Sequence, residues 1–311
     1  MEFLQAIFIT PFVEMFSYPL FLLEVVIQGM LTGVMYSLVA LGFVLIFKAS
    51  GVFNFAQGSM VLFAALNLVG MMGLGVPVWL AIILTMVVMI VLAFMIERFM
   101  LAKLVNQEPI ILFMATIGLD YMLQGAGQLA WGSNVKKLDV GIPEIAFDVG
   151  GVLLNSFELV AALVGAVLVL ALALFFQKTP TGRALRAVAD DHQAALSVGI
   201  PLNNIWIIVW TVAGGVGLVA GIMWGAKSGV QFSLALIALK ALPVLILGGF
   251  TSVPGAIVGG LIIGVGEKVA EIYWGPAVGG AIENWFAYIL AMFFLMFRPQ
   301  GLFGEKIIER I

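Results

Sequence analysis

Two charged residues inside apolar stretches are the first candidates for chemistry in this sequence. Asp120 and Lys240 each lie within a run of residues apolar enough to enter a lipid bilayer. A charge at the centre of a bilayer is costly, so it normally faces a partner or water and often marks a substrate or ion path. Because the expected depths of the two residues are compatible, we predict that they share a polar site. A structural ion pair and a place on a transport path explain the pattern equally well.

Three amide side chains form a second group of candidates. Asn54, Gln57 and Asn67 lie within the apolar residues 52–72. Amides at such positions form hydrogen bonds between helices or line the path of a polar substrate. We favour hydrogen bonding between helices and keep a role in the path as the alternative.

The residue types exclude most kinds of catalysis. The 311 residues include one histidine and no cysteine, which excludes disulfides, thiolate metal sites and cysteine catalysis. Residues 221–228 come close to a phosphate-binding loop, but Ala226 stands where the second glycine is needed, and the stretch ends an apolar run. We therefore expect no catalytic residues, no metal site, no cofactor and no ATP hydrolysis by this chain.

The densest cluster of charge lies in a loop, residues 178–200, between two long apolar runs. The loop is predicted to form a helix, because Thr179 is a suitable N-cap and Pro180 suits the first helical position. Gly199 and Pro201 mark its end. A helix this polar is expected on the membrane surface, and an ordinary solvated loop is the alternative.

One face of this predicted helix is expected to bind a protein. The face consists of residues three or four positions apart: Leu185, Val188, His192, Leu196 and Gly199. Arg183, Arg186 and Asp190 fall elsewhere on the helix, at the rim of the expected contact. Lipid is a poorer partner, because acidic residues are unfavourable beside an anionic leaflet.

Composition places the chain among helical membrane proteins. Hydrophobic residues make up 63% of it and charged residues 10%, and its apolar runs are continuous rather than alternating. We predict an all-α transmembrane bundle that forms a single domain over residues 1–311. About nine spans are expected, with these approximate bounds: 19–47, 52–72, 78–96, 110–131, 159–176, 203–226, 234–247, 256–273 and 281–297.

Three further features concern the parts around and between the spans. Residues 1–18 are apolar but short and broken by Pro11, so we expect them at the membrane interface. Residues 132–155 form a polar loop, in which residues 147–154 have the alternation and Gly-Gly turn of a β-hairpin. Glycines four positions apart predict close contacts between helices: Gly29 with Gly33, Gly255 with Gly259, and Gly217 with Gly221 and Gly225.

The basic residues predict the orientation of the chain. If residues 178–200 are cytoplasmic, nine lysines and arginines lie on the inner side and three on the outer side. This bias predicts that the N-terminus is outside, that the C-terminus is inside and that residues 132–155 are on the outer side. No basic residue precedes Lys48, so we expect the N-terminal segment to be retained rather than cleaved as a signal peptide.

Six short stretches together carry a resemblance. They are residues 33–42 (GVMYSLVALG), 48–58 (KASGVFNFAQG), 182–187 (GRALRA), 198–200 (VGI), 247–249 (LGG) and 254–256 (PGA). These stretches resemble the permease subunits of branched-chain amino acid ABC importers of the Liv type, and most of all the LivH-like member of the pair. The likeness extends from about residue 28 to residue 304. Departures are the extension before residue 28, and Phe53 and Gln57.

The resemblance implies a function and a set of partners. The chain would be the permease subunit of an ATP-driven importer for branched-chain or similar small amino acids, multi-pass in the cell inner membrane. It would pair with a second homologous permease subunit, two cytoplasmic ATP-binding subunits and a periplasmic substrate-binding protein, and with no nucleic acid. Residues 178–200 would be the cytoplasmic coupling loop, with these ATPase-coupling residues: Arg183, Leu185, Arg186, Val188, Asp190 and His192.

Three other functions are kept as alternatives. Relatives of the resembled group move urea, short amides or aromatic acids. An ion-coupled secondary transporter would use Asp120 as its proton or sodium site. A membrane assembly subunit would transport nothing itself.

Overall fold

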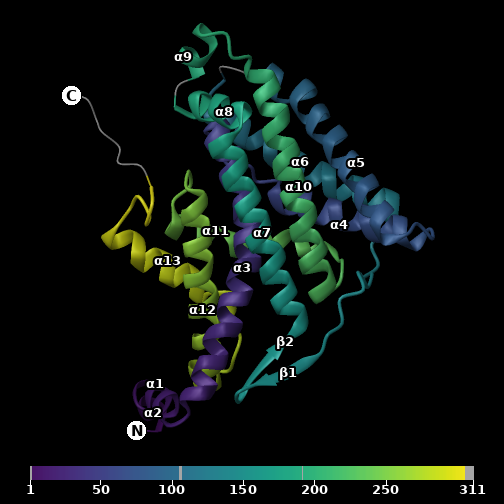
Figure 1. Ribbon diagram of the computed structural model, residues 1–311. Coiled ribbons are helices and arrows are strands. Elements are labelled where there is room, and N and C mark those ends of the chain that lie inside the picture. Colours follow the sequence, from purple (N-terminus) through teal and green to yellow (C-terminus); the bar gives the residue numbers. More distant parts are fainter. Residues whose placement is uncertain (1, 105–106, 191, 305–311) are drawn as a thin grey trace. The chain divides into compact units, whose positions relative to one another are not determined.

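The computed structural model describes residues 2–104, 107–190 and 192–304, except for the side chains of residues 2, 3, 190, 192 and 193 (Figure 1). Helices dominate these residues. Six helices are long and apolar enough to cross a membrane: α3 (Pro19–Ser50), α5 (Val78–Phe99, continued by the short η1, Leu101–Lys103), α6 (Pro109–Trp131), α7 (Ser156–Lys178), α10 (Leu202–Ser228) and α12 (Val253–Val278). The predicted class, a helical protein with several membrane spans, is confirmed.

Three of the predicted spans are shorter helices. α4 (Gln57–Gly73), α11 (Ile237–Gly248) and α13 (Phe286–Phe297) have 17, 12 and 12 residues. At 1.5 Å per residue they are about 26, 18 and 18 Å long, less than a hydrocarbon core about 30 Å thick. The 3-10 helices η2 (Phe232–Leu236) and η3 (Ile282–Asn284) precede α11 and α13. Nine full-length spans are therefore not confirmed by the helices of the described residues.

Local side chains affect two of these short helices. The Asn54 side-chain oxygen accepts a hydrogen bond from the backbone N–H of Ala56 at 3.1 Å. Such a side-chain turn competes with helix formation, so α4 begins only at Gln57. In α11, Pro243 lies within the helix and removes one backbone donor. Hydropathy does not detect either effect.

The N-terminal segment forms two short helices, α1 (Glu2–Phe8) and α2 (Thr10–Ser17). The indole N–H of Trp274 on α12 donates a hydrogen bond to the carbonyl of Ile7 at 3.1 Å. The same indole ring meets the ring of Phe12 edge-on, with 5.7 Å between centroids. The segment is therefore tied to α12, and its place at the membrane interface stays a prediction.

The predicted β-hairpin is confirmed. Strands β1 (Ala146–Val149) and β2 (Val152–Asn155) pair antiparallel, and Gly150 and Gly151 form the turn with φ of 67° and 90°. Positive φ at both central positions suits glycine, which has no Cβ. The backbone N–H of Leu153 also donates a hydrogen bond at 3.1 Å to the carboxylate of Glu24, which attaches the hairpin to α3.

The described residues form two compact units, and the single domain stays a prediction. Unit 1 combines the described residues of 1–37, 141–166 and 240–311, and unit 2 combines those of 38–140 and 167–239. Each unit is therefore built from segments that are distant in sequence, and α3 and α7 supply residues to both. Clusters of this kind depend on contacts between distant segments, which hydropathy cannot predict.

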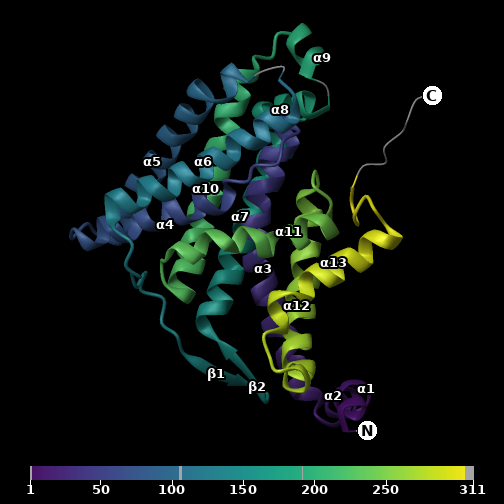
Figure 2. The ribbon, with the colours of Figure 1, turned by 180° about the vertical axis from the view of Figure 1, so that it is seen from behind.

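Helix α4 is central to unit 2. Helices α5, α6 and α10 lie around α4 (Figures 1 and 2), and the short η2 also packs against it. Small residues allow the closest of these contacts. A Cβ added to Gly221 of α10 would lie 2.7 Å from the carbonyl oxygen of Val61 in α4. The predicted packing role of Gly221 is confirmed.

In unit 1, α3 and α12 cross with their backbones in contact. A Cβ added to Gly29 of α3 would lie 2.6 Å from the Cα of Val265, and one added to Gly33 would collide with the backbone of Gly260. In the other direction, a Cβ on Gly264 would collide with the backbones of Gly29 and Gly33. The close contact predicted from the spacing of Gly29 and Gly33 is confirmed, and it holds α3 and α12 in a fixed register.

Candidate functional site

Asp120 lies in unit 2, where it ties α6 to α4. Its side chain is buried, and the hydroxyl of Ser59 on α4 donates to one carboxylate oxygen at 2.5 Å. The side-chain N–H of Gln124, one turn further along α6, donates to the other oxygen at 2.8 Å. Both oxygens are therefore satisfied by neutral donors, which supports a structural role for this carboxylate.

Asn67 makes a second tie between the same two helices. Its side-chain oxygen accepts a hydrogen bond from the indole N–H of Trp131 on α6 at 3.1 Å, and its side-chain N–H₂ donates to the carbonyl of Phe63 at 2.7 Å. Asn54 acts more locally, since its oxygen accepts the N–H of Ala56. Asn67 fits the expected hydrogen bonding between helices, whereas Asn54 stabilises the turn before α4.

Gln57 differs from the other two amides. It is fully buried at the start of α4, and its side-chain nitrogen has no hydrogen-bond partner among the described residues. Its oxygen accepts from the side chain of Asn54 at 3.4 Å. A Cβ added to Gly42 would collide with this amide, so the glycine makes room for it. Gln57 is the one predicted amide that offers an unused donor to a ligand.

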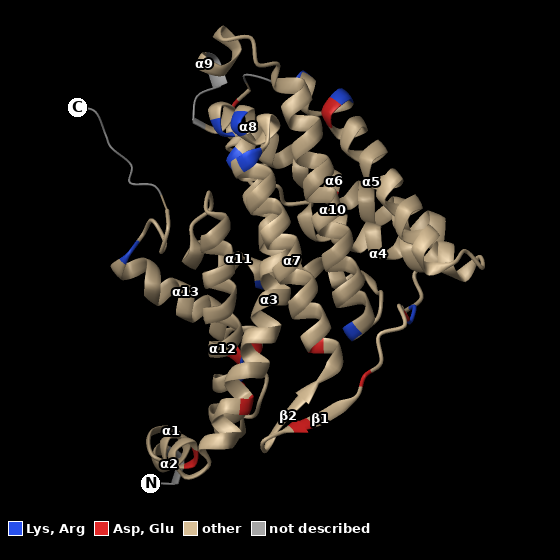
Figure 3. Cartoon of the chain, in the orientation of Figure 1, with Lys and Arg blue, Asp and Glu red and all other residues tan. Residues whose placement is uncertain are grey.

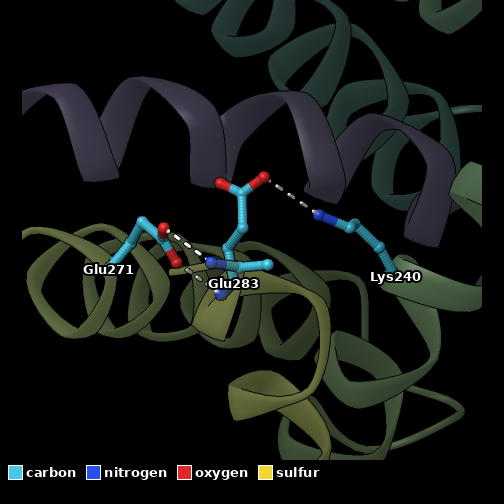
Figure 4. A network of polar contacts seen from close by, with 4 residues as sticks. Lys240, Glu271 and Glu283 are labelled. Atoms are coloured by element: carbon cyan, nitrogen blue, oxygen red, sulfur yellow. Dashed lines mark hydrogen bonds and ion pairs between the residues drawn. The ribbon is translucent and has the colours of Figure 1, made fainter. Parts of the chain in front are cut away.

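Lys240 lies in unit 1, on α11. Its ammonium group forms an ion pair with a carboxylate oxygen of Glu283 at 3.8 Å (Figure 4). Glu283 belongs to η3, and the Glu271 carboxylate of α12 holds that turn by accepting the backbone N–H groups of Ala281 at 2.9 Å and Glu283 at 3.0 Å. Lys240 is therefore part of a network of charges on α11, α12 and η3.

The expected polar site shared by Asp120 and Lys240 does not fit this arrangement. Asp120 belongs to unit 2 and Lys240 to unit 1. Asp120 is satisfied by Ser59 and Gln124, and Lys240 pairs with Glu283. Neither charge needs the other as its partner, because a polar group nearer in the fold already serves each.

Glu267 and Tyr36 are site residues that the sequence analysis missed. Glu267 of α12 is 2% exposed, and its carboxylate accepts a hydrogen bond from the hydroxyl of Tyr36 on α3. The Oε1 atom of Glu267 has no hydrogen-bond partner among the described residues. The signal was present in the sequence, because Glu267 and Lys268 interrupt the apolar run of α12.

The start and end of the predicted surface helix are confirmed. Thr179 is its N-cap, since its hydroxyl accepts the backbone N–H of Gly182 at 2.9 Å, and Pro180 is the first helical residue. Gly199 follows its end with φ of 83°. The described part of the loop contains α8 (Pro180–Asp190) and α9 (His192–Ser197), and Asp191 between them lies outside the described residues.

Two residues of the predicted binding face are not exposed as expected. Leu185 is 1% exposed and Val188 is 0% exposed, so both side chains are buried within unit 2, where α8 packs against α10. Leu196 on α9 is 52% exposed. The apolar side of α8 therefore packs on its own chain.

The remaining residues of the predicted coupling group are placed as follows. Arg186 is partly buried, and its guanidinium donates a hydrogen bond to the carbonyl of Phe176 at the end of α7 at 2.5 Å. Arg183 is exposed. The side chains of Asp190 and His192 lie outside the described residues.

The sequence of the chain resembles known proteins over most of its length. It matches the family described as "Branched-chain amino acid transport system / permease component" over residues 25–297. The chain belongs to this family. The match runs from α3 to the end of α13, so both units of the permease are included.

Individual relatives match the permease over almost their full length. The high-affinity branched-chain amino acid transport system permease protein BraD of Pseudomonas aeruginosa is 29% identical over 304 residues, which are 93% of this chain and 98% of BraD. LivH of Escherichia coli K12 is 28% identical over 312 residues, 94% of this chain and 98% of LivH. PsaBC from Streptococcus pneumoniae in complex with Fab superposes with a TM-score of 0.48 at 16% identity, covering 86% of this chain and 89% of that chain. The resemblance to the Liv-type permeases is confirmed.

Asp120→Ala should destabilise the permease, because it leaves the buried hydroxyl of Ser59 and the partly buried side-chain N–H of Gln124 without their acceptor. Each unsatisfied group costs about 1–3 kcal/mol. Asp120→Asn keeps an oxygen for Ser59 and should be milder. The unfolding temperature of the purified variants in detergent measures both effects. An Asp120→Asn variant that is as stable as the wild type but wholly inactive in transport would contradict the structural role.

Proposed function

We propose that this chain is the permease subunit of an ATP-binding cassette importer that moves branched-chain amino acids into the cell. The observation that supports it is the family match over residues 25–297. The relatives BraD and LivH are named as high-affinity branched-chain amino acid transport permeases, and they match over nearly their whole length. Leucine, isoleucine and valine are therefore the proposed substrates.

A stand-alone carrier driven by protons or sodium ions is the main alternative, and it would use Asp120 as its ion site. Both oxygens of that carboxylate accept hydrogen bonds from Ser59 and Gln124. This arrangement ties two helices and gives each oxygen a donor from within the chain, which favours a structural role over an ion site. The ABC importer is the better supported function.

Transport by the reconstituted complex tests this function. Purified permease with its ATP-binding subunits and binding protein, in proteoliposomes, should accumulate radiolabelled leucine only when ATP is supplied. Unlabelled isoleucine and valine should compete, whereas urea, acetamide and aromatic acids should not. Accumulation driven by a proton or sodium gradient without ATP would contradict the proposal, and so would uptake of urea without uptake of leucine.

The proposed orientation puts the N-terminus outside and the C-terminus inside the cell inner membrane. The short helices α4, α11 and α13, with the turns around them, complete nine passes in this topology. Basic residues of unit 2 support it, because they gather around α8 and the neighbouring end of α5 (Figure 3). Those on the proposed inner side are Lys48, Arg98, Lys103, Lys178, Arg183 and Arg186, against Lys136, Lys137 and Lys227 on the outer side.

Single cysteines test the orientation, since the natural chain contains none. Lys137→Cys should react with a membrane-impermeant maleimide in intact spheroplasts, and Arg183→Cys should react only after the membrane is permeabilised. Both residues are exposed, so access within the protein does not limit either reaction. Labelling of Arg183→Cys but not of Lys137→Cys in intact spheroplasts would reverse the proposed topology.

In the proposed importer, ATP-binding subunits dock on the loop that contains α8 and α9. A second, homologous permease subunit and a periplasmic binding protein complete the assembly. The exposed residues of the loop carry the contact: Arg183 on α8, Leu196 on α9, and Val198 just after it, the last two 52% and 73% exposed. Apolar side chains exposed on a polar loop are typical of a protein contact.

The buried residues of α8 have a different task in this proposal. Leu185 and Val188 attach α8 to unit 2, and Arg186 joins it to the end of α7 through the carbonyl of Phe176. Movement of the ATP-binding subunits at α9 would therefore pass through α8 to α7 and α10. A loosely attached loop would absorb that movement instead.

Leu196→Asp and Val198→Asp should release the ATP-binding subunits and abolish uptake, because each puts an unpaired charge into the contact at a cost of about 3–5 kcal/mol. The permease itself should stay folded and inserted. Co-purification of the subunits, with leucine uptake, measures the effect. Leu185→Asp is the matched variant: it should lower the unfolding temperature of the permease. Normal co-purification and uptake by Leu196→Asp and Val198→Asp would exclude this surface as the docking site.

A further inference from the structure

The charged residues of α11, α12 and η3 do not balance. These three elements carry two lysines and three glutamates, a sum of −1 when all are ionised: Lys240, Lys268, Glu267, Glu271 and Glu283. A charge without a partner is costly in a membrane-spanning region. The imbalance therefore favours one further positive charge at this place.

Two of the three carboxylates already have partners. Glu271 accepts the backbone N–H groups of Ala281 and Glu283, so it fixes the turn that carries η3. Glu283 pairs with Lys240 (Figure 4). Each of these two carboxylates stabilises the local structure. The negative charge without a partner is therefore that of the third carboxylate.

Glu267 is that third carboxylate. It is 2% exposed, it accepts one hydrogen bond from Tyr36, and its Oε1 atom has no hydrogen-bond partner among the described residues. Lys240 and Lys268 lie close enough to act on it electrostatically. Among the charged groups of this network, Glu267 alone is deeply buried with one oxygen unused.

The glycine contact between α3 and α12 holds this carboxylate in place. Glu267 follows Gly264 by three residues and Tyr36 follows Gly33 by three residues, so both lie one helical turn from the crossing. The two backbones touch there, and neither helix can shift without a collision. A carboxylate fixed in this way can bind a ligand with little loss of side-chain freedom.

We propose that the Glu267 carboxylate binds the positively charged ammonium group of an amino acid as it passes through the permease. This inference rests on the proposed transport of amino acids and names the group that recognises them. An ammonium group donates to the free Oε1 and pairs with the negative charge of Glu267. The ammonium group of Lys240 has three donors, so it can keep its ion pair with Glu283 at 3.8 Å and also interact with the carboxylate of the same substrate.

A metal ion is a poorer ligand for this site. No group of three or more histidine, cysteine, aspartate or glutamate side chains among the described residues is arranged to hold a metal ion. A tyrosine hydroxyl, one carboxylate and nearby ammonium groups suit a zwitterion instead, because they present both signs of charge. Sodium ions and protons are the competing ligands that the experiment must separate.

The first measurement is leucine uptake by the complete importer in proteoliposomes. Glu267→Gln keeps the shape and removes the charge, so it should lower the rate at least about tenfold, which corresponds to 1.4 kcal/mol. ATP hydrolysis and co-purification of the ATP-binding subunits should not change. Glu97→Gln is the control, because Glu97 is also a buried glutamate with an unused oxygen, but in unit 2; it should transport at the wild-type rate.

The outcomes separate this inference from the function on which it rests. If the wild-type importer does not move leucine, the proposed function fails. If the wild type moves leucine and Glu267→Gln moves it equally fast, only the role of Glu267 is overturned. Equal losses in Glu267→Gln and Glu97→Gln would also overturn it, since any buried carboxylate would then have the same effect.

The second measurement identifies the ligand group. The unfolding temperature of the permease with its ATP-binding subunits, without the binding protein, should rise with millimolar leucine and with isopentylamine, which keeps the ammonium group only. The keto acid of leucine, which keeps the carboxylate but lacks the ammonium group, should give a much smaller shift, and Glu267→Gln should abolish the shifts with leucine and isopentylamine. Three results would overturn the inference: no shift with leucine, an unchanged shift in Glu267→Gln, or the same shift from sodium chloride or lower pH alone.

Discussion

Lipid offers no hydrogen bonds, so each polar group in the membrane-spanning part of this permease must find its partner within the chain. This constraint orders unit 2. Asp120 is satisfied by Ser59, and Trp131 by Asn67, so both polar contacts join α6 to α4. Both contacts involve α4, the helix on which α5, α6 and α10 pack. Polar residues lower the hydropathy of a membrane-spanning segment, but here they form the hydrogen bonds that hold the neighbouring helix in place.

Several buried polar atoms of the described residues do not meet this constraint, and two of them belong to candidate site residues. The Gln57 nitrogen and the Glu267 Oε1 are both fully buried and without a hydrogen-bond partner among the described residues. Burial of an unsatisfied polar group costs about 1–3 kcal/mol, so such a group calls for an explanation. In a permease, a polar substrate can explain such a group, because the substrate supplies the missing hydrogen-bond partner during part of each transport cycle. Asp120, fully satisfied, needs no such partner.

Local signals predicted local structure well, as shown by the N-cap at Thr179, the glycine turn of the hairpin and the contact at Gly33. Each depends on residues adjacent in sequence or on one helix face. The failures depend on partners that are distant in sequence. Leu185 was expected on a binding face, but it is buried because α8 packs on α10. Glu267 was missed because its role depends on its interactions with Tyr36 and Lys240, which belong to other helices.

Charge balance also bears on the choice among substrates within this family. A neutral substrate such as urea or a short amide would leave the negative charge of Glu267 unpaired, at a cost that a membrane-spanning region makes high. An aromatic acid would add a second negative charge beside it. An amino acid brings an ammonium group for Glu267 and a carboxylate for Lys240, so each of its two charges meets a group of opposite sign, although it adds no net charge to the five around it. The electrostatics of unit 1 therefore favour a zwitterion, in agreement with the substrates for which BraD and LivH are named.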